Sequence, residues 1–197
     1  MSGGPGSAPL VVGIGGSTRP ASLTEQVVAR ALGFAAERGA RTVMFDGPFL
    51  AGLPIYSPGD VRRGDDEREF IAAIRACDGV IVGSPGYHGS LSGLVKNALD
   101  LIEDTAGDPE PYLEGRAFGC IVTAAGEQAC GMTLVALRSI AHALRAWPTP
   151  YGATFSERSP LIAGQGMEEP ATLESLRLVA RHVVDFARWR AARRAEG

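Results

Sequence analysis

The sequence predicts one α/β domain with a doubly wound parallel sheet, and three observations lead to this prediction. Short apolar stretches, of the kind that form strands buried on both faces, alternate five times with amphipathic helical stretches. The helical stretches are long enough to serve as the crossovers that join neighbouring parallel strands. The 197 residues contain no internal repeat and no interdomain linker.

Each predicted strand is short and apolar. The first, Leu-Val-Val-Gly-Ile, is closed by Gly15 and Gly16, and the third reads Gly-Val-Ile-Val-Gly. The five predicted strands cover residues 10–14, 41–45, 79–83, 117–123 and, finally, 150–155.

The predicted helices carry apolar residues at three- and four-residue spacing. In the first of them Ser22 or Thr24 stands near the start, and Gly39 marks the end. The five predicted helices cover residues 21–38, 65–76, 91–103, 132–144 and 172–192. Residues 47–60 are rich in Pro and Gly and predict a loop. Residues 1–9 predict a disordered tail ahead of a single domain over 10–197.

The number of strands bears on the topology. Two doubly wound strand orders are common, and five strands favour the flavodoxin-like order 2-1-3-4-5 over the dinucleotide-binding one. In either order, ligands bind beyond the carboxyl ends of the strands. We therefore expect the functional residues in the loops that follow the first, third and fourth strands.

Composition excludes several classes of function. A formal net charge of −3 argues against nucleic-acid binding, and no apolar run is long enough for a membrane span or a secretion signal. Three cysteines without a CxxC pair predict neither a disulfide framework nor a metal site, so we expect a reducing cytoplasm. Cys77 and Cys120 are typical of core positions. Cys130 falls in a predicted loop, and a redox role for it stays open.

The first loop is suited to a phosphate. A dinucleotide-binding GxGxxG motif fails because Thr18 stands at its third glycine position. Hydroxyls and one guanidinium stand there instead, at the start of a helix whose amides and dipole favour an anion. The alternative interpretation is plain helix capping by Ser22 or Thr24, with Arg19 in solvent.

The other two loops are suited to a flat ring. Residues 83–100 leave a strand through a glycine-punctuated turn that carries Tyr87 and His88. Glycines allow close approach of the backbone to a ligand, and an aromatic side chain can pack against a ring. Residues 123–131, built mostly of small side chains, form the third loop. Together the three loops predict a shallow cleft for a large planar ligand that carries a phosphate.

Two segments carry a resemblance to a known family. Gly16 begins the pattern Gly-Ser-x-Arg-x-x-Ser, and Ser84 begins the pattern Ser-Pro-x-Tyr-His-Gly-Ser-x-Ser-Gly-x-x-Lys-Asn-x-x-Asp. Both stand in the expected order and context, so residues 10–155 resemble the NADPH-dependent FMN reductases. The resemblance implies a flavodoxin-like fold, bound FMN, NADPH or NADH as electron donor, and assembly as a homodimer or homotetramer.

The resemblance also implies the binding residues. The FMN phosphate would be held by Ser17, Arg19, Ser22 and Thr24. The ribityl chain and the ring edge would be lined by Pro85, Gly86, Tyr87, His88, Gly89 and Ser90. The other margin of the ring would be closed by Gly126 and Glu127.

No residue is assigned to catalysis. Hydride transfer between a nicotinamide and a flavin requires stacking and distance, and the cofactor supplies the chemistry. We therefore interpret His88 as a positioning hydrogen-bond donor. Lys96 is the one lysine among 19 basic residues, and Asp100 lies four residues further on the same helix face. We expect its compact ammonium to tie this helix to the cleft or to a second subunit. The resemblance implies a flavin next to a subunit interface, for which residues 91–103 and 47–60 are candidates.

The expected function is that of an FMN-dependent NAD(P)H oxidoreductase with ping-pong transfer of hydride. The acceptor, which the sequence does not specify, would be free flavin, a quinone or another electron-poor compound. One alternative is a flavodoxin-type electron carrier, against which Arg19 and the modest net charge both argue. Another is a tailoring enzyme for one metabolite, with the cleft shaped by Glu127, Gln128, Cys130 and residues 106–113.

Overall fold

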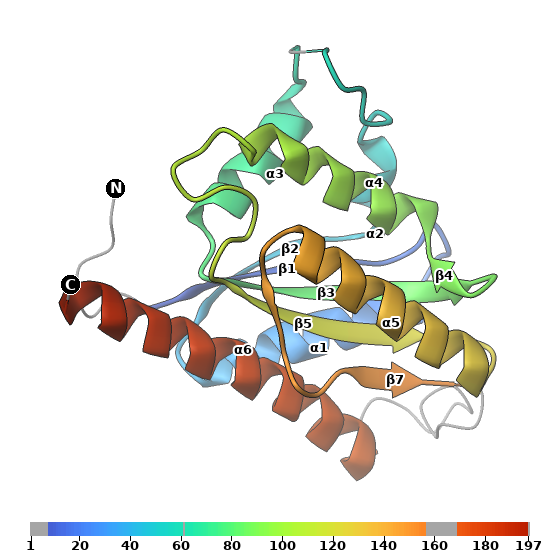
Figure 1. Cartoon of the computed structure of the whole chain (residues 1–197). Helices are drawn as coiled ribbons and strands as arrows, with labels where there is room; N and C mark the ends of the chain where they lie inside the picture. Colours follow the sequence, from blue (N-terminus) through green and yellow to red (C-terminus); the bar gives the residue numbers. More distant parts are fainter. Residues whose placement is uncertain (1–7, 61, 157–168, 197) are drawn as a thin grey trace.

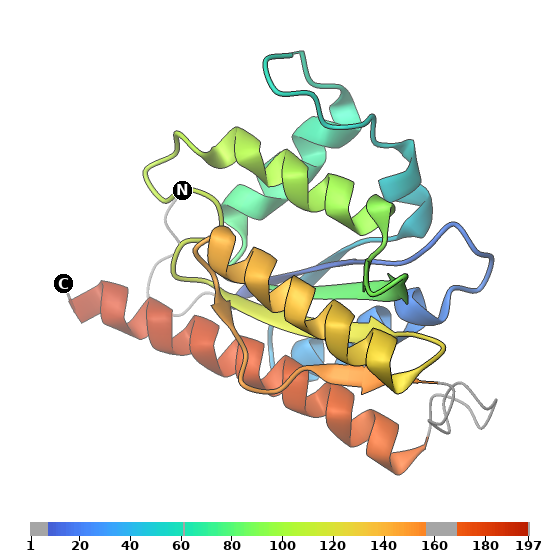
Figure 2. The same ribbon diagram turned by 45° about the vertical axis from the view of Figure 1, so that its right-hand side comes forward.

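The structure, a computed structural model, describes residues 8–60, 62–156 and 169–196. Most of the predicted tail, residues 1–7, lies outside this range. The described chain folds as three layers, with a parallel sheet between two layers of helices (Figure 1). The second view, turned by 45°, shows the same layering (Figure 2).

The sheet has the predicted topology. Its order is β2-β1-β3-β5-β6, with β7 paired to β5 further along the same edge, and every pairing among these strands is parallel. The expected order 2-1-3-4-5 is thus confirmed, with the fifth strand in two pieces. The bounds are β1 (Leu10–Gly15), β2 (Arg41–Phe45), β3 (Gly79–Tyr87), β5 (Ala117–Thr123), β6 (Trp147–Pro148) and β7 (Ala153–Phe155).

The break in the fifth strand has a local cause. The amides of Trp147 and Thr149 bond to the carbonyls of Arg116 and Phe118 at the start of β5. The Thr149 hydroxyl then donates to the carbonyl of Tyr151 at 2.8 Å, which turns the chain out of the ladder before β7 begins. The prediction of one continuous strand over 150–155 is therefore wrong, because a side-chain hydrogen bond competes with the ladder.

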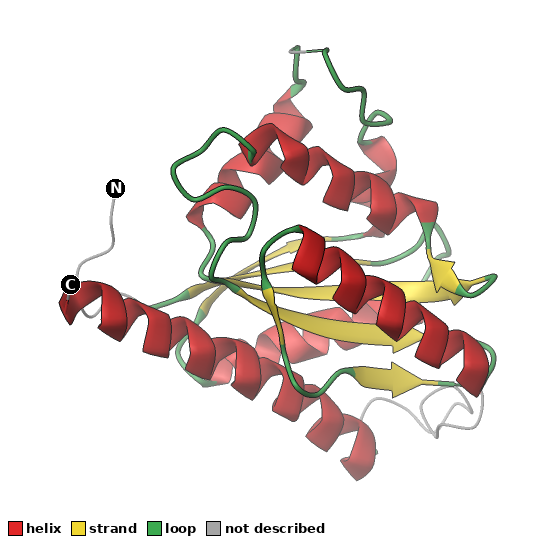
Figure 3. Ribbon diagram, in the orientation of Figure 1, coloured by secondary structure: helices red, strands yellow, loops and turns green. Residues whose placement is uncertain are grey.

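The helices divide between the two faces of the sheet (Figure 3). One face carries α1 (Leu23–Glu37) and α6 (Pro170–Glu196), which pack against each other and share a buried apolar cluster with the sheet. The other face carries α3 (Asp65–Ala76), α4 (Gly93–Leu101) and α5 (Glu127–Ala143), above a second buried cluster. The carboxyl ends of the strands, where we expect the functional residues, therefore lie between two separately packed apolar clusters.

Four local elements differ from the predictions. A short helix, α2 (Gly47–Gly52), occupies the start of the predicted loop, because the Asp46 side chain accepts a hydrogen bond from the Phe49 amide at 2.9 Å. Helix α4 is shorter than predicted and continues as a 3-10 turn, η1 (Ile102–Thr105). A short strand, β4 (Ser90–Leu91), pairs with the end of β3. Helix α5 begins at Glu127, five residues before the predicted start.

Two glycines on the strands, Gly15 and Gly83, allow α1 to lie close to the sheet. A Cβ atom on Gly83 would lie 2.3 Å from Cγ2 of Val28, and one on Gly15 would lie 2.8 Å from the carbonyl oxygen of Gly83. Val28 itself is fully buried. The backbone of α1 therefore approaches β1 and β3 more closely than any side chain at these strand positions would permit.

All three cysteines are buried in the core. Burial raises the pKa of Cys77 to about 11 and that of Cys120 to about 12. The pKa of Cys130 is also raised, first by burial and then by the nearby Glu127 carboxylate. Cys130 lies in the first turns of α5 and is 2% exposed. These thiols are therefore core groups with little thiolate near neutral pH.

We predict that Gly83→Ala lowers the free energy of unfolding by about 1–3 kcal/mol, because its methyl group overpacks the contact with Val28. Gly33→Ala is the matched control. Gly33 lies within α1 with no atom near its Cβ position, so the same change there should raise stability by about 0.5–1 kcal/mol. Urea unfolding followed by circular dichroism measures both. Equal effects at the two positions would contradict the packing argument.

We predict that the native thiols are nearly inert toward a thiol-specific reagent at pH 8. The raised pKa values of Cys77 and Cys120 correspond to thiolate fractions lower by about a hundredfold or more, and burial blocks access as well. Three equivalents should react only after unfolding. Rapid labelling of one thiol in the native protein, mapped to Cys130, would instead restore a redox role for that residue.

Candidate functional site

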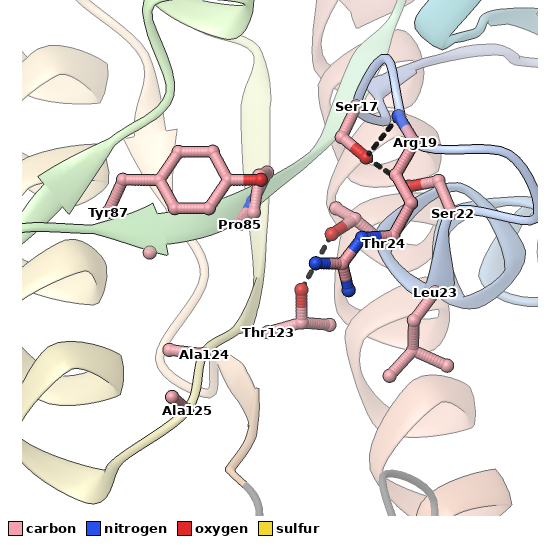
Figure 4. A pocket seen from close by; sticks show the side chains of 11 residues that line it. Ser17, Arg19, Ser22, Leu23, Thr24, Pro85, Tyr87, Thr123, Ala124 and Ala125 are labelled. Atoms are coloured by element: carbon pink, nitrogen blue, oxygen red, sulfur yellow. Dashed lines mark hydrogen bonds between the residues drawn. The ribbon is translucent and has the colours of Figure 1, made fainter.

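A cavity of about 340 Å³ opens at the carboxyl ends of β1, β3 and β5 (Figure 4). It lies where the three predicted loops meet. Its lining residues are Ser17, Arg19, Ser22, Leu23, Thr24, Pro85, Gly86, Tyr87, Thr123, Ala124 and Ala125. Seven of these were predicted to bind a ligand, so the structure brings together most of the expected site.

One side of the cavity is polar and faces the first turn of α1. Ser22 is the N-cap of this helix, and its hydroxyl accepts a hydrogen bond from the Glu25 amide at 3.4 Å. The Ser17 hydroxyl donates to that of Ser22 at 3.1 Å and accepts from the Arg19 amide at 3.3 Å. Figure 4 shows Ser17, Arg19 and Ser22 gathered on this side. Hydroxyls and a guanidinium therefore stand at the positive end of the helix dipole.

Thr24 has a different role from that of a cap. Its hydroxyl lies 2.6 Å from the hydroxyl of Thr123, which ends β5, and both residues are buried. This hydrogen bond joins the first turn of α1 to the end of β5, and both residues line the cavity (Figure 4). The interpretation that Ser22 caps the helix is confirmed, and Thr24 and Thr123 fix the distance between two of the three loops.

The opposite side of the cavity is flat and largely apolar. Pro85 and Tyr87 come from the end of β3, and Ala124 and Ala125 follow β5. The Tyr87 side chain is 51% exposed, although aromatic side chains are usually more buried. A half-exposed ring beside small side chains leaves a surface on which a second flat group can pack.

The turn after Tyr87 explains why some predicted residues lie elsewhere. Tyr87 pairs with Ser90 in the β3–β4 hairpin, so His88 and Gly89 form a two-residue turn. Both have positive φ, 51° and 84°, as the tight hairpin turn of type I′ requires. His88 is exposed at this turn. None of His88, Gly89 and Ser90 lines the cavity.

The third loop is shorter than predicted because α5 begins at its centre. Gly126 is the N-cap residue of α5, and Glu127 is its first residue. The Glu127 carboxylate accepts a hydrogen bond from the Ser156 hydroxyl at 2.5 Å, which ties it to the chain after β7. Neither Gly126 nor Glu127 lines the cavity. The small residues directly after β5 lie at the cavity in their place.

The residues that sequence reasoning missed are Leu23, Thr123, Ala124 and Ala125. Leu23 and Thr123 were hidden within regular elements, as a helix residue and the last residue of a strand. Ligands in such folds lie beyond the carboxyl ends of the strands, so the position of Thr123, Ala124 and Ala125 directly at the end of a predicted strand was the signal that could have identified them.

Residues 106–113 lie away from this cavity. The Tyr112 amide bonds to the Thr105 hydroxyl, and its carbonyl accepts from the Arg116 guanidinium just before β5. Tyr112 instead lines a second cavity of about 540 Å³ between α4 and α5. The expectation that this stretch walls the cleft is therefore wrong, because its contacts hold it at the amino ends of the strands.

Within residues 8–60, 62–156 and 169–196, no cluster of three or more His, Cys, Asp or Glu side chains is arranged to hold a metal ion. None of the helices described is both long and apolar enough to cross a membrane.

Known proteins with similar sequences are flavoproteins. An iron-sulfur flavoprotein of Methanocaldococcus jannaschii is 32% identical over 96 residues, which cover 46% of this chain and 50% of that protein. An NAD(P)H-dependent FMN reductase of Pseudomonas aeruginosa is 29% identical over 118 residues, 59% of this chain and 60% of that protein. The chain thus matches half to three fifths of the length of these curated relatives.

The fold is also found among solved structures. The apo form of an NADH:FMN oxidoreductase aligns with a TM-score of 0.71 and 21% identity, over 90% of this chain and 89% of that one. Residues 9–159 match the family model for NADPH-dependent FMN reductases, which is most of the chain and includes the three loops at the cavity. The chain therefore belongs to the NADPH-dependent FMN reductase family.

Proposed function

We propose that this protein is an FMN-dependent oxidoreductase that takes electrons from NADPH or NADH. The observation that carries the proposal is the composition of the cavity. The first turn of α1, with Arg19 and two serine hydroxyls, forms one side, and an apolar wall of Pro and Ala side chains forms the other, at the carboxyl ends of the central strands. FMN carries a phosphate at one end and a flat ring at the other. The family and the flavoprotein relatives support the same proposal.

The polar side fits a phosphate. Arg19 is the single charged residue among the described residues that line the cavity. The nearby carboxylate of Glu25 accepts a hydrogen bond from the Gly47 amide at 3.2 Å, outside that lining. An anion would therefore meet a guanidinium, two serine hydroxyls and the helix dipole without an opposing charge on the wall.

The apolar side fits a flat ring. The volume of about 340 Å³ lies within the range of pockets that hold cofactors and ligands of moderate size. Pro85 and the two alanines offer flat walls, and Tyr87 is exposed beside them. Between the two sides, the hydroxyls of Thr24 and Thr123 offer the polar partners that a sugar-alcohol chain requires.

The chemistry divides between the cofactor and the chain. A bound FMN supplies the hydride acceptance and donation. The residues of the chain bind the phosphate, hold the ring against the apolar wall and leave its exposed side open. None of the described residues lining the cavity is an Asp, Glu, His, Cys or Lys.

An open apolar wall beside Tyr87 can accept two substrates one after the other. NAD(P)H would occupy the space beside Tyr87, leave, and be replaced by the acceptor. Free flavin, a quinone or another electron-poor aromatic compound meets the same requirement, which is a flat face. Glu127 and residues 106–113, which we expected to shape the cleft, lie outside the lining formed by the described residues. The three buried thiols support our proposal of a reducing cytoplasm as the site of action.

We further propose that two copies associate through α4 and the segment after α2. The second cavity lies on this face, with Leu99, Ile140 and Tyr56 among its lining residues. Ile55, next to Tyr56, is 82% exposed. Lys96 lines this cavity and forms an ion pair with Asp100 at 2.5 Å, with both side chains about half exposed. Such a pair contributes little to a single chain, so its value would lie at a subunit contact.

We predict that Arg19→Ala weakens FMN binding by about 10- to 100-fold, because a charge-assisted hydrogen bond to the phosphate is lost. Binding of riboflavin, which has no phosphate, should stay within about twofold of the unchanged protein. Quenching of flavin fluorescence measures both ligands. The matched control is Arg62→Ala, since Arg62 is an exposed arginine remote from the cavity. Equal loss of FMN and riboflavin affinity would contradict a phosphate role for Arg19.

We predict that Ile55→Asp shifts the protein toward the monomer in sedimentation velocity. The substitution places a charge where an apolar side chain would be buried against the second copy, at a cost of several kcal/mol unless paired. Ile55→Val serves as control and should leave the mass unchanged. An Ile55→Asp variant with the same mass at every concentration would show that subunits associate elsewhere.

A further inference from the structure

The hairpin that carries Tyr87 extends beyond the parallel sheet. The pairing of β3 with β1 ends at Gly83, and its pairing with β5 ends at Pro85. Within the described chain, the strand pairs of residues 86–91 are those between β3 and β4 (Figure 1). We call these six residues the Tyr87 hairpin. A two-stranded hairpin is at best marginally stable in water, so contacts with other elements must hold it in place.

Two of these contacts hold the base of the Tyr87 hairpin. Ser84 is fully buried, and its hydroxyl donates to the carbonyl of Pro85 and accepts from the amide of Ser92, both at 2.9 Å. Leu91 packs against the buried cluster beneath α4 and α5. These contacts fix where the hairpin leaves and rejoins the rest of the chain, but they do not reach Tyr87.

A third contact comes from α5 and lies opposite Tyr87. Thr133 is fully buried on this helix, and its hydroxyl donates to the carbonyl of Ser90 at 3.2 Å. Ser90 is the residue that pairs with Tyr87 across the hairpin. A threonine within a helix can bond to a carbonyl of its own preceding turn. Here the hydrogen bond goes to a different element, and it therefore links the hairpin to the helix.

The absence of a side chain at Gly86 brings the hairpin onto α5. A Cβ atom there would lie 2.8 Å from the Thr133 hydroxyl oxygen and 3.0 Å from Cβ of Ala124. Successive side chains of a strand point to opposite sides, so Tyr87 points to the side away from this contact. Tyr87 lines the cavity (Figure 4). One side of the hairpin is therefore held by α5 while the other presents the tyrosine ring.

From these contacts we infer that Thr133 is a positioning residue for the ring-binding side of the cavity. Its hydroxyl holds the Tyr87 hairpin at the height at which Tyr87 joins the apolar wall. Thr133 itself is not among the lining residues, so it acts through the hairpin backbone. The effect on ring binding rests on the proposed function, whereas the anchoring of the hairpin does not.

The bond can be removed without unfolding the core. Thr133→Val replaces the hydroxyl with a methyl group and keeps the branched shape of the side chain. Ser90 is exposed, so its carbonyl can bond to water once the threonine hydroxyl is gone. The hairpin then loses its attachment opposite Tyr87, while Ser84 and Leu91 still hold its base.

The first test is amide hydrogen exchange on the full chain without flavin. Thr133→Val should speed exchange of the amides in residues 86–91 by about three- to tenfold, the factor that corresponds to one net hydrogen bond. Thr133→Ser retains the hydroxyl and should stay within about twofold of the unchanged protein. Circular dichroism of each variant establishes that the fold is retained.

Thr105→Val is the matched control for a buried threonine elsewhere. The Thr105 hydroxyl donates to the carbonyl of Ile102 at 2.8 Å and accepts from the amide of Tyr112 at 3.0 Å, on η1 and away from the cavity. Its loss should lower stability and leave both exchange in residues 86–91 and flavin affinity unchanged.

The second test is flavin affinity measured by fluorescence quenching. Thr133→Val should weaken FMN and riboflavin binding equally, by about two- to fivefold, because both ligands carry the same ring. This equal loss differs from the result expected for Arg19→Ala, which affects the phosphate end. If Thr133 acts through Tyr87, Thr133→Val should have no further effect on riboflavin affinity in a Tyr87→Ala background.

The inference is overturned if Thr133→Val leaves exchange in residues 86–91 unchanged, or if Thr105→Val speeds it as much. It is also overturned if Thr133→Val lowers riboflavin affinity by the same factor with and without the Tyr87 ring, since its effect would then bypass the hairpin. An unchanged protein that bound neither flavin would refute the proposed function and, with it, the ring-binding role. Hydrogen exchange would then still decide whether Thr133 anchors the hairpin.

Discussion

The close packing of α1 on the sheet is the constraint on which the site depends. Gly83 and Gly15 have no side chains where α1 crosses β1 and β3, and Val28 fills the space they leave. The distance between α1 and the sheet determines the position of the first turn of α1 relative to the end of β5. The hydrogen bond between Thr24 and Thr123, at 2.6 Å, is possible only with the helix at that distance. Packing of an apolar core thus positions two hydroxyls and a helix dipole.

The electrostatic character of the site follows from the same arrangement. The start of α1 supplies a partial positive charge, and Arg19 is the one charged side chain among the described residues on the walls. The opposite wall is built of Pro and Ala side chains with one exposed tyrosine. Walls of this kind suit a ligand with one anionic end and one flat end, and this contrast in polarity is the basis of our proposal.

Most of the fold and more than half of the site could be predicted from the sequence, because both depend on local patterns. Short apolar runs between helices determine the sheet order, and strand ends determine where the loops meet. The failures have physical reasons. Gly126 and Gly131 suggested a loop, but a small-residue segment can be helical when Ala and Cys side chains are buried, so α5 begins at Glu127. The resemblance implies that His88 lines the ring edge, whereas the cavity lining among the described residues does not include it. Its positive φ in a two-residue turn directs the chain away, and only the pairing of β3 with β4 reveals this.

The carboxyl ends of the strands and the far edge of the sheet are constrained in different ways, and α6 packs next to that edge. At the carboxyl ends the strands must converge on a ligand, so residues there are constrained by close contacts with α1. At the far edge the sheet must end without exposing a ladder, which β6 does by being two residues long and carrying Pro148. Helix α6 then has to cover one face of the strands, and its inner side is uniformly apolar for that reason. Outside that inner side, Phe186 packs against the rim of the core, and its ring contacts Trp189 on the same helix and Trp147 on β6. Aromatic side chains thus join α6 to the last strand of the sheet.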